Sequence, residues 1–213
     1  MQTVALIDYG AGNIPSAQRA LEVAVERSGL SCELIVTDSP EKIAAADRVV
    51  IPGVGHFKDC REAMFGVSGL VEALEDSIHK KGRPVLGICV GMQLMADLGL
   101  EDGETPGFGW IPGKVEHIPT DAGLPIPHMG WNELVVRTEH PVLEGIQTGN
   151  HAYFVHSYHM HCENPSDLQV EVDYGGHITA AIGRDNVFGT QFHPELSQET
   201  GLRLLTNWIK WNP

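Results

Sequence analysis

Apolar residues in the first half of the chain occur in short runs that alternate with segments of helical spacing. The runs expected to form buried strands are residues 4–7, 32–36, 48–51 and 83–86. Asn13 and Gly29 are typical of the ends of a helix over about 14–28, and Ser39-Pro40 of a second helix start. A third helical stretch, about 56–81, is interrupted near 66–69. This alternation favours a parallel sheet with right-handed crossovers.

The second half has short strand patterns separated by turns rich in Gly and Pro. We expect strands within 107–121 and 134–137, and at 153–162, 168–173, 177–183 and 187–192, followed by a last helix over about 198–211. Trp131 is expected in a Gly/Pro-rich loop at 128–132. The pattern predicts a single α/β domain over residues 1–213 whose C-terminal half is rich in β-structure.

Composition narrows the class of protein. The 213 residues include 14 Lys and Arg against 28 Asp and Glu, a formal net charge of −14. Such a surface repels phosphate backbones, so nucleic-acid binding is disfavoured. No apolar run approaches the roughly 20 residues that span a bilayer, and the N-terminal residues lack the basic start of a signal peptide. We expect a cytoplasmic protein with neither a nucleic-acid nor a membrane partner.

The stretch Gly87-Ile88-Cys89-Val90-Gly91-Met92-Gln93 carries the strongest chemical signal. It follows a predicted strand and opens a predicted helix that Gly99 would end. A cysteine with glycine two residues away on each side is the G-x-S-x-G elbow with sulfur in place of oxygen. The helix start favours a thiolate, and the Val90 N–H points to where an oxyanion would form. Cys89 is therefore the candidate nucleophile; the alternative is a buried structural cysteine.

Two glycine loops follow predicted strands without matching a nucleotide-binding fingerprint. Gly10-Ala11-Gly12-Asn13 has Pro15 at the third glycine position, and Gly53-Val54-Gly55 has Lys58 there. The second loop follows the strand at 48–51, whose carboxyl end should lie beside that of the elbow strand. An N–H of Gly53 or Val54 could therefore be a second oxyanion donor, and glycine allows that peptide to point either way.

Eleven histidines compete for the role of general base. His193-Pro194-Glu195 follows the predicted strand at 187–192, and residues i and i+2 of an extended chain share a face. His193 would face the cysteine while Glu195 orients its ring.

The rival cluster is His156, His159, His161 and Cys162. Its spacing fits no common zinc pattern, so we interpret its histidines as strand residues, His156 being nearest to function, and predict no metal and no cofactor. Cys32, Cys60 and Cys162 are interpreted as packing residues, because no cysteine pair has the spacing of a disulfide framework or zinc site.

The elbow and Phe192-His193-Pro194-Glu195 together resemble the class I (triad) glutamine amidotransferases. Further segments resemble, more specifically, the glutaminase subunits of imidazole glycerol phosphate synthase: residues 8–13, 52–57, 128–132 and 153–158. The resemblance, from residue 4 to about 205, implies a flavodoxin-like three-layer fold with a mixed, mostly parallel central sheet. It also implies a heterodimer with a (β/α)8 cyclase. L-Glutamine would be hydrolysed to glutamate and ammonia through a cysteinyl thioester. The cyclase would use the ammonia to form imidazole glycerol phosphate and AICAR in histidine biosynthesis.

The same resemblance implies roles for individual residues. Cys89, His193 and Glu195 would be the triad; Gly55, Gln93, Ser157 and Tyr158 would contact glutamine, with Glu101 meeting its α-ammonium group; Asn13, Trp131 and Tyr153 would face the cyclase. One departure is Leu196, where the family often has Lys or Arg. The alternatives are a stand-alone cysteine hydrolase, the glutaminase subunit of another class I amidotransferase, and a binding module without activity.

Overall fold

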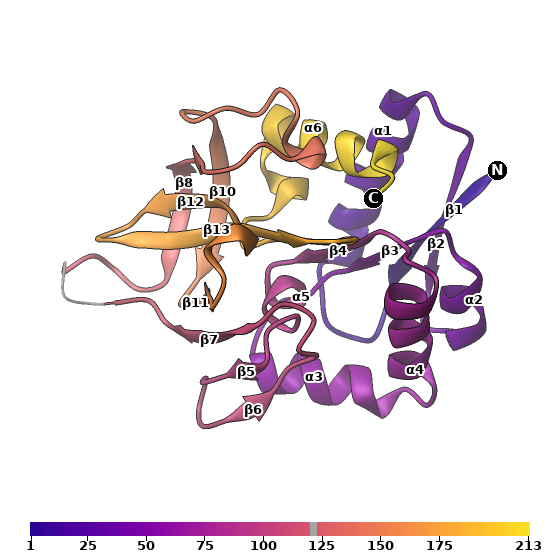
Figure 1. The fold of residues 1–213 in the computed structure, drawn as a ribbon, viewed down its shortest axis with the longest axis horizontal. Coiled ribbons are helices and arrows are strands. Elements are labelled where there is room, and N and C mark those ends of the chain that lie inside the picture. The colour runs from indigo at the N-terminus through magenta and orange to yellow at the C-terminus, as the bar shows by residue number, and fades with distance from the viewer. Residues whose placement is uncertain (120–122) are drawn as a thin grey trace.

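The computed structural model describes residues 1–119 and 123–213 and is built around an eight-stranded sheet (Figure 1). Five neighbouring strands run parallel: β2 (Cys32–Thr37), β1 (Gln2–Ile7), β3 (Arg48–Ile51), β4 (Val85–Ile88) and β14 (Val187–Thr190). Antiparallel pairing continues the sheet through β13 (His177–Arg184), β12 (Leu168–Asp173) and β9 (Val135–Val136). The predicted mixed, mostly parallel sheet is confirmed.

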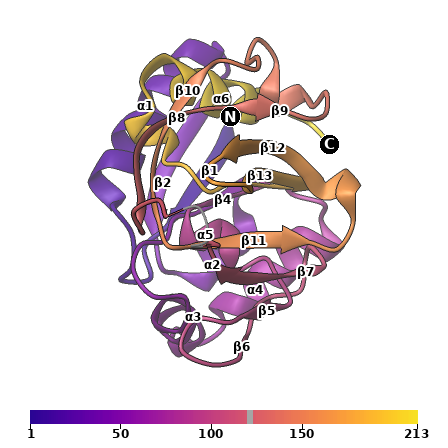
Figure 2. The ribbon, with the colours of Figure 1, turned by 90° about the vertical axis from the view of Figure 1, so that its left-hand side faces the viewer.

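Helices cover both faces of the parallel half, which gives the predicted three layers (Figures 1 and 2). On one face lie α1 (Ile14–Ser28) and α6 (Gln198–Lys210); on the other lie α2 (Pro40–Ala45), α3 (Phe57–Gly66) and α4 (Leu70–Glu75). The bounds predicted for α1 are confirmed, because the Asn13 side chain accepts from Ser16 N–H and Gly29 is left-handed with φ 70°. No helix of the described residues is long and apolar enough to cross a membrane.

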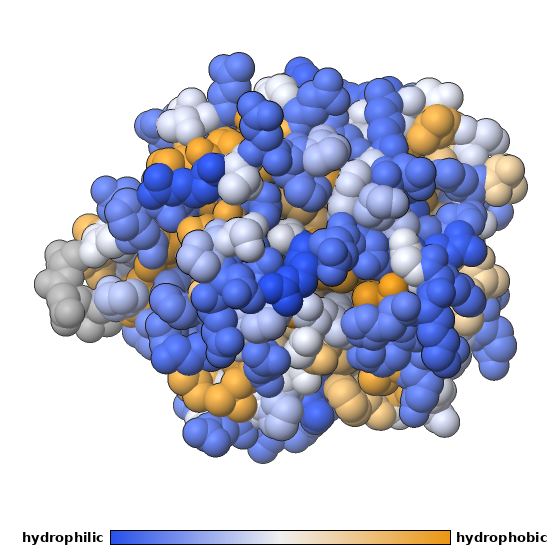
Figure 3. Space-filling view, viewed as in Figure 1, coloured by the Kyte–Doolittle hydropathy of each residue, from blue (hydrophilic) through white to orange (hydrophobic). Residues whose placement is uncertain are grey.

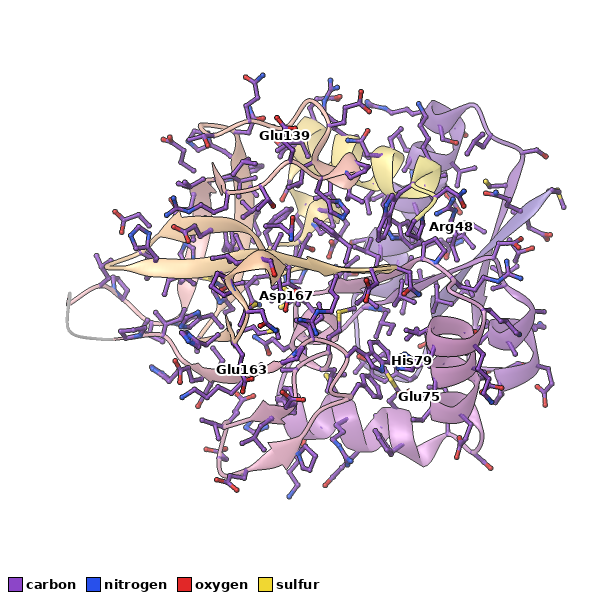
Figure 4. All side chains as sticks on the ribbon, viewed as in Figure 1. Arg48, Glu75, His79, Glu139, Glu163 and Asp167 are labelled. Carbon is purple, nitrogen blue, oxygen red and sulfur yellow. The ribbon has the colours of Figure 1, made fainter. Side chains whose placement is uncertain are left out.

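The predicted helical stretch at 56–81 consists of several pieces. After α3 the chain breaks at Gly69, which is left-handed with φ 81°, and α4 then continues into a π-helical turn, Asp76–Lys80. Glu75, which precedes this turn, and His79, which lies within it, approach each other to 3.1 Å between Oε2 and Nε2 (Figure 4). The interruption expected near 66–69 is therefore confirmed.

Two smaller sheets make up the rest of the β-rich half. One is a ribbon of β8 (His128–Glu133) and β10 (His151–His156); the other joins β11 (Tyr158–Cys162), β7 (Gly113–His117), β5 (Leu98–Gly99) and β6 (Thr105–Pro106). The prediction of a loop at 128–132 is wrong, because β8 pairs along its whole length with β10 and places Trp131 opposite Tyr153. Of the strands expected within 107–121, β7 is observed, whereas Thr120 and Asp121 lie outside the described residues.

Polar side chains cover most of the face seen in Figure 3, with apolar residues in scattered patches. Arg48, labelled in Figure 4, is a charged residue that is buried instead: it starts β3 and is 3% exposed. Its guanidinium donates to the Trp208 carbonyl at 3.1 Å and lies over the indole ring. This contact ties α6 to the sheet.

Candidate active site

Cys89 occupies a strained turn between β4 and the single-turn helix α5 (Val90–Gln93), with φ 53° and ψ −111°. A Cβ on Gly91 would lie 2.0 Å from the Ile51 carbonyl oxygen, so only glycine allows the elbow to pack against β3. The elbow predicted from the glycine spacing is confirmed, but a helix reaching Leu98 is wrong. The carbonyl groups that would continue the helix accept instead from the next loop: Phe108 N–H binds Leu94 O at 2.7 Å.

His193 and Glu195 lie beside this turn and are buried with it. His193 Nδ1 is 2.8 Å from Glu195 Oε1, and the imidazole lines the same cavity as Cys89. Burial disfavours the imidazolium, but the interactions with Cys89 and Glu195 outweigh it and raise the pKa of His193. The candidate nucleophile, base and orienting carboxylate are therefore in contact.

The backbone that holds His193 differs from the prediction. Pro194–Leu196 forms a 3-10 turn, so His193 and Glu195 do not share a face of an extended strand. Ser197 Oγ donates to His193 O at 2.6 Å, and His193 N–H donates to Tyr153 O at 3.0 Å. The base is thus fixed by the turn on one side and by β10 on the other.

The expected oxyanion donor at Val90 is engaged within the protein. Val90 N–H donates to the carbonyl oxygen of Gly53 at 3.3 Å, so the Gly53–Val54 peptide presents its oxygen to the elbow. The carbonyls on either side are held elsewhere: Tyr9 Oη donates to Pro52 O at 2.5 Å and Cys60 Sγ to Val54 O at 3.3 Å. One peptide could therefore rotate while its neighbours stay anchored.

A cavity of about 430 Å³ opens in front of Cys89 and His193. Its lining includes every residue predicted to contact glutamine, namely Gly55, Gln93, Glu101, Ser157 and Tyr158, together with Val90, Val54 and Asn13. The Glu101 carboxylate accepts from Phe57 N–H at 2.8 Å, which fixes it at the start of α3. His156, expected to be the histidine of its cluster nearest to function, also lines the cavity, whereas sequence reasoning missed Pro127, Val155 and Leu196 as part of this wall.

Two buried histidines connect the cavity wall to β8. His156 Nδ1 lies 2.8 Å from Tyr158 O, and its Nε2 lies 2.9 Å from His128 Nδ1. Asn132 Nδ2 completes the row at 3.1 Å from His128 Nε2. Burial lowers the pKa of His128 to about 4 and that of His156 to about 3, so both are neutral at pH 7. Among residues 1–119 and 123–213, no group of three or more His, Cys, Asp or Glu is placed to hold a metal ion.

The outer face of the β8–β10 ribbon is apolar. Met129 is 65% exposed and Trp131 48% exposed, and their cross-strand partners on that face are Val155 and Tyr153. Trp131 and Tyr153 pack edge to face with ring centroids 6.0 Å apart. We call these four residues the ribbon face. Val155 also lines the cavity, so the ribbon face adjoins its mouth.

Comparison with known proteins gives one consistent result. The family described as "Glutamine amidotransferase class-I" matches residues 5–211. The chain is 54% identical to the imidazole glycerol phosphate synthase subunit HisH of Brucella abortus, covering 99% of each chain. It is 52% identical to the HisH subunit of Cereibacter sphaeroides, covering 98% of each.

Among solved structures, a glutamine amidotransferase superposes with a TM-score of 0.71 at 17% identity, over 97% of this chain and 99% of the other. A Thermotoga maritima glutamine amidotransferase gives 0.62 at 15% identity, over 98% and 83%. The last two likenesses establish the fold alone. The chain belongs to the class I glutamine amidotransferase family and, within it, to the HisH subunits of imidazole glycerol phosphate synthase.

Proposed function

We propose that the chain is a single glutamine amidotransferase domain that hydrolyses L-glutamine and delivers the ammonia to a cyclase subunit. The cyclase then forms imidazole glycerol phosphate and AICAR in histidine biosynthesis, in the cytoplasm. The observation that carries the proposal is the contact of Cys89, His193 and Glu195 beside a cavity that Glu101 and Gln93 line.

The first half of the reaction forms a thioester. The Cys89 thiolate attacks the side-chain amide carbon of glutamine, and a C–S bond forms as the carbonyl oxygen takes the negative charge. His193, held protonated by Glu195, gives its proton to the nitrogen, and the C–N bond breaks to release ammonia. Glu101 binds the α-ammonium group of the substrate through its carboxylate.

The second half regenerates the enzyme. His193, now neutral, takes a proton from water, and the resulting hydroxide attacks the thioester carbon. The C–S bond breaks, glutamate leaves, and the thiolate returns to its contact with the imidazolium. Both tetrahedral intermediates carry an oxyanion, so both need the donors at the elbow.

The Gly53–Val54 peptide supports a resting state of low activity. Its carbonyl accepts from Val90 N–H, which leaves that donor unavailable to an oxyanion. If the peptide rotates, Gly53 O leaves Val90 and the Val54 N–H turns toward the elbow. Loss of one oxyanion donor costs about 2.7–4 kcal/mol, or roughly a hundred- to a thousandfold in rate. We therefore infer that the ligand-bound partner completes the oxyanion hole.

In this proposal the partner is a cyclase subunit with a (β/α)8 barrel, and the similarity to subunits of a synthase supports a partner subunit. Asn13 and, from the ribbon face, Val155 line the cavity, so a partner docked on the ribbon face could receive ammonia directly. Leu196 is 40% exposed at the same mouth. It offers an apolar contact in place of the basic residue common in the family.

The test is a glutaminase assay of the chain alone, with the cyclase, and with the cyclase and its ligand. We expect activity to rise at least a hundredfold in the complete complex, and Cys89→Ala to abolish activity while still binding the cyclase. Equal rates in all three conditions would instead support a stand-alone cysteine hydrolase. Retained activity in Cys89→Ala would refute the proposed nucleophile.

A further inference from the structure

Gln191 lies behind the nucleophile, two residues before His193, and none of its surface reaches solvent. Its backbone N–H donates to Ala180 O at 2.8 Å, which extends the pairing of β14 with β13 by one residue. The main chain at this position is therefore fixed by the sheet. Its carboxamide is directed to the elbow, where Nε2 lies 3.7 Å from Cys89 Sγ.

A row of hydrogen bonds determines which end of this carboxamide faces the sulfur. The Tyr158 carbonyl oxygen can only accept, so the Gln93 atom 3.0 Å from it must be the amide nitrogen. The same nitrogen lies 3.1 Å from Gln191, whose facing atom must then be the acceptor Oε1. The other end of the Gln191 carboxamide is therefore NH₂. The sulfur faces a donor, and the assignment rests on the chemistry of a main-chain carbonyl.

The Tyr158 carbonyl is itself held in place. It accepts from His156 Nδ1 at 2.8 Å, which makes His156 Nε2 an acceptor for His128 Nδ1. His156 from β10 and Gln93 from α5 thus both donate to the Tyr158 carbonyl oxygen. Gln93 uses its nitrogen for Tyr158 and Gln191, and its oxygen remains for a ligand in the cavity.

We propose that Gln191 is a fourth catalytic residue: its side-chain N–H donates to the Cys89 sulfur and stabilises the thiolate from the side opposite the cavity. Hydrogen bonding to the charged form of a group favours that form, and bonds to ionised groups are stronger than neutral ones. His193 lies near the same sulfur in the cavity, so a cation and an N–H donor would both stabilise the thiolate. The catalytic role rests on the proposed function, whereas the effect on the sulfur does not.

The test measures the thiolate directly. Iodoacetamide alkylation of the full chain is followed against pH by the mass of the peptide that holds Cys89, because Cys32 and Cys162 are partly exposed and react as well. Gln191→Met removes donor and acceptor at similar length; Gln191→Glu keeps the acceptor for Gln93 and removes the N–H. A hydrogen bond to an ionised group corresponds to about 1–2 pH units, so we expect both variants to raise the alkylation midpoint by about that much.

Gln169 offers a matched control. It is a buried glutamine whose Nε2 donates to Ser166 O at 2.9 Å and Gly183 O at 3.2 Å. Gln169→Met loses these bonds away from the elbow and should leave the Cys89 midpoint unchanged. The proposal would be overturned if both Gln191 variants had the same alkylation midpoint as the wild-type chain. It would also be overturned if Gln169→Met shifted the Cys89 midpoint as much as the Gln191 variants do.

A second measurement needs no variant at Gln191. In the wild-type chain the side-chain amide signals of Gln191, followed by NMR, should move with the same pH midpoint as the alkylation. That movement should be lost in Cys89→Ala. Amide signals that stay constant through the midpoint would refute the contact. If the shifts appear but the complete complex fails to hydrolyse glutamine, the proposed function fails and the Gln191 contact stands.

Discussion

The Val90 amide donates to the carbonyl oxygen of Gly53, so the elbow's main-chain donor is satisfied within the protein. Flanking anchors at Pro52 and Val54 confine any change to the single peptide between Gly53 and Val54. In the proposed mechanism, activation would exchange one acceptor for another at Val90: the Gly53 oxygen would leave and the substrate oxyanion would replace it.

Removal of the anchor at Tyr9 should weaken that control. Tyr9→Phe leaves the buried Pro52 carbonyl without its donor, and an unsatisfied buried group costs about 1–3 kcal/mol. We expect the free energy of unfolding to fall by this amount in urea titrations. The ratio of partner-stimulated to basal glutaminase activity should also fall, because the peptide before Gly53 no longer keeps a fixed position. An unchanged ratio together with the stability loss would limit Tyr9 to a packing role.

Glu195→Gln should impair catalysis without unfolding the chain. The substitution keeps the shape of a buried side chain but removes the charge that raises the pKa of His193. Loss of such an orienting carboxylate reduces kcat by as much as about 10⁴-fold in a triad enzyme. We expect a drop of about 10²–10⁴ in kcat of the complete complex, measured as glutamate release. A drop below tenfold would mean that Glu195 does not orient the base.

The ribbon face should dominate binding of the partner. Trp131→Ala removes a half-exposed indole, and truncation of a central aromatic typically costs about 2–4 kcal/mol of binding, or roughly 30- to 1,000-fold in Kd. Calorimetry with the cyclase measures the change. Leu30→Ala, which truncates a 43% exposed side chain after α1, is the control and should leave Kd unaltered. Similar losses in both variants would contradict a docking role for the ribbon face.

Buried histidines predict a loss of stability in mild acid. Burial lowers the pKa of His128 and His159 to about 4, whereas an unfolded histidine titrates near 6.5. The unfolded chain therefore binds more protons between pH 6.5 and 4, and the free energy of unfolding must fall as the pH is lowered through this range. Each such residue contributes about 1–2 kcal/mol to the change between pH 7 and 5.

His159→Phe isolates one of these contributions. His159 Nδ1 is buried without a hydrogen-bond partner, so its replacement leaves no new unsatisfied group. Urea titrations at pH 7 and pH 5 should show a smaller stability difference for this variant than for wild type. His161→Phe, at an exposed position of the same strand, should retain the full difference. Equal pH dependence in all three chains would disprove the assignment to His159.

The parallel half of the fold and the elbow could be predicted because their signals are local. Asn13 and Gly29 bound α1 by capping alone, and glycine spacing alone places Cys89 on a turn. The errors arise where distant segments compete. N–H groups of the loop 107–111 donate to the carbonyls that would otherwise lengthen α5. Pairing with β10 makes the segment around Gly130 a strand, although its composition is typical of a loop. Gln191 was missed because its orientation depends on Gln93, whose own orientation is set by the Tyr158 carbonyl, and these three residues meet only in the folded chain.

The position of β14 determines when the site can exist during synthesis. This last strand in the sequence pairs with β4 on one side and β13 on the other, and it is the hydrogen-bonded link between the parallel and antiparallel halves of the sheet. Cys89 and His193 approach each other only through that insertion, across about a hundred residues of chain. Strand pairing between residues so far apart in sequence forms slowly. During synthesis Cys89 is therefore made long before His193 can pack against it. His193 is therefore placed beside Cys89 only after β14 has entered the sheet.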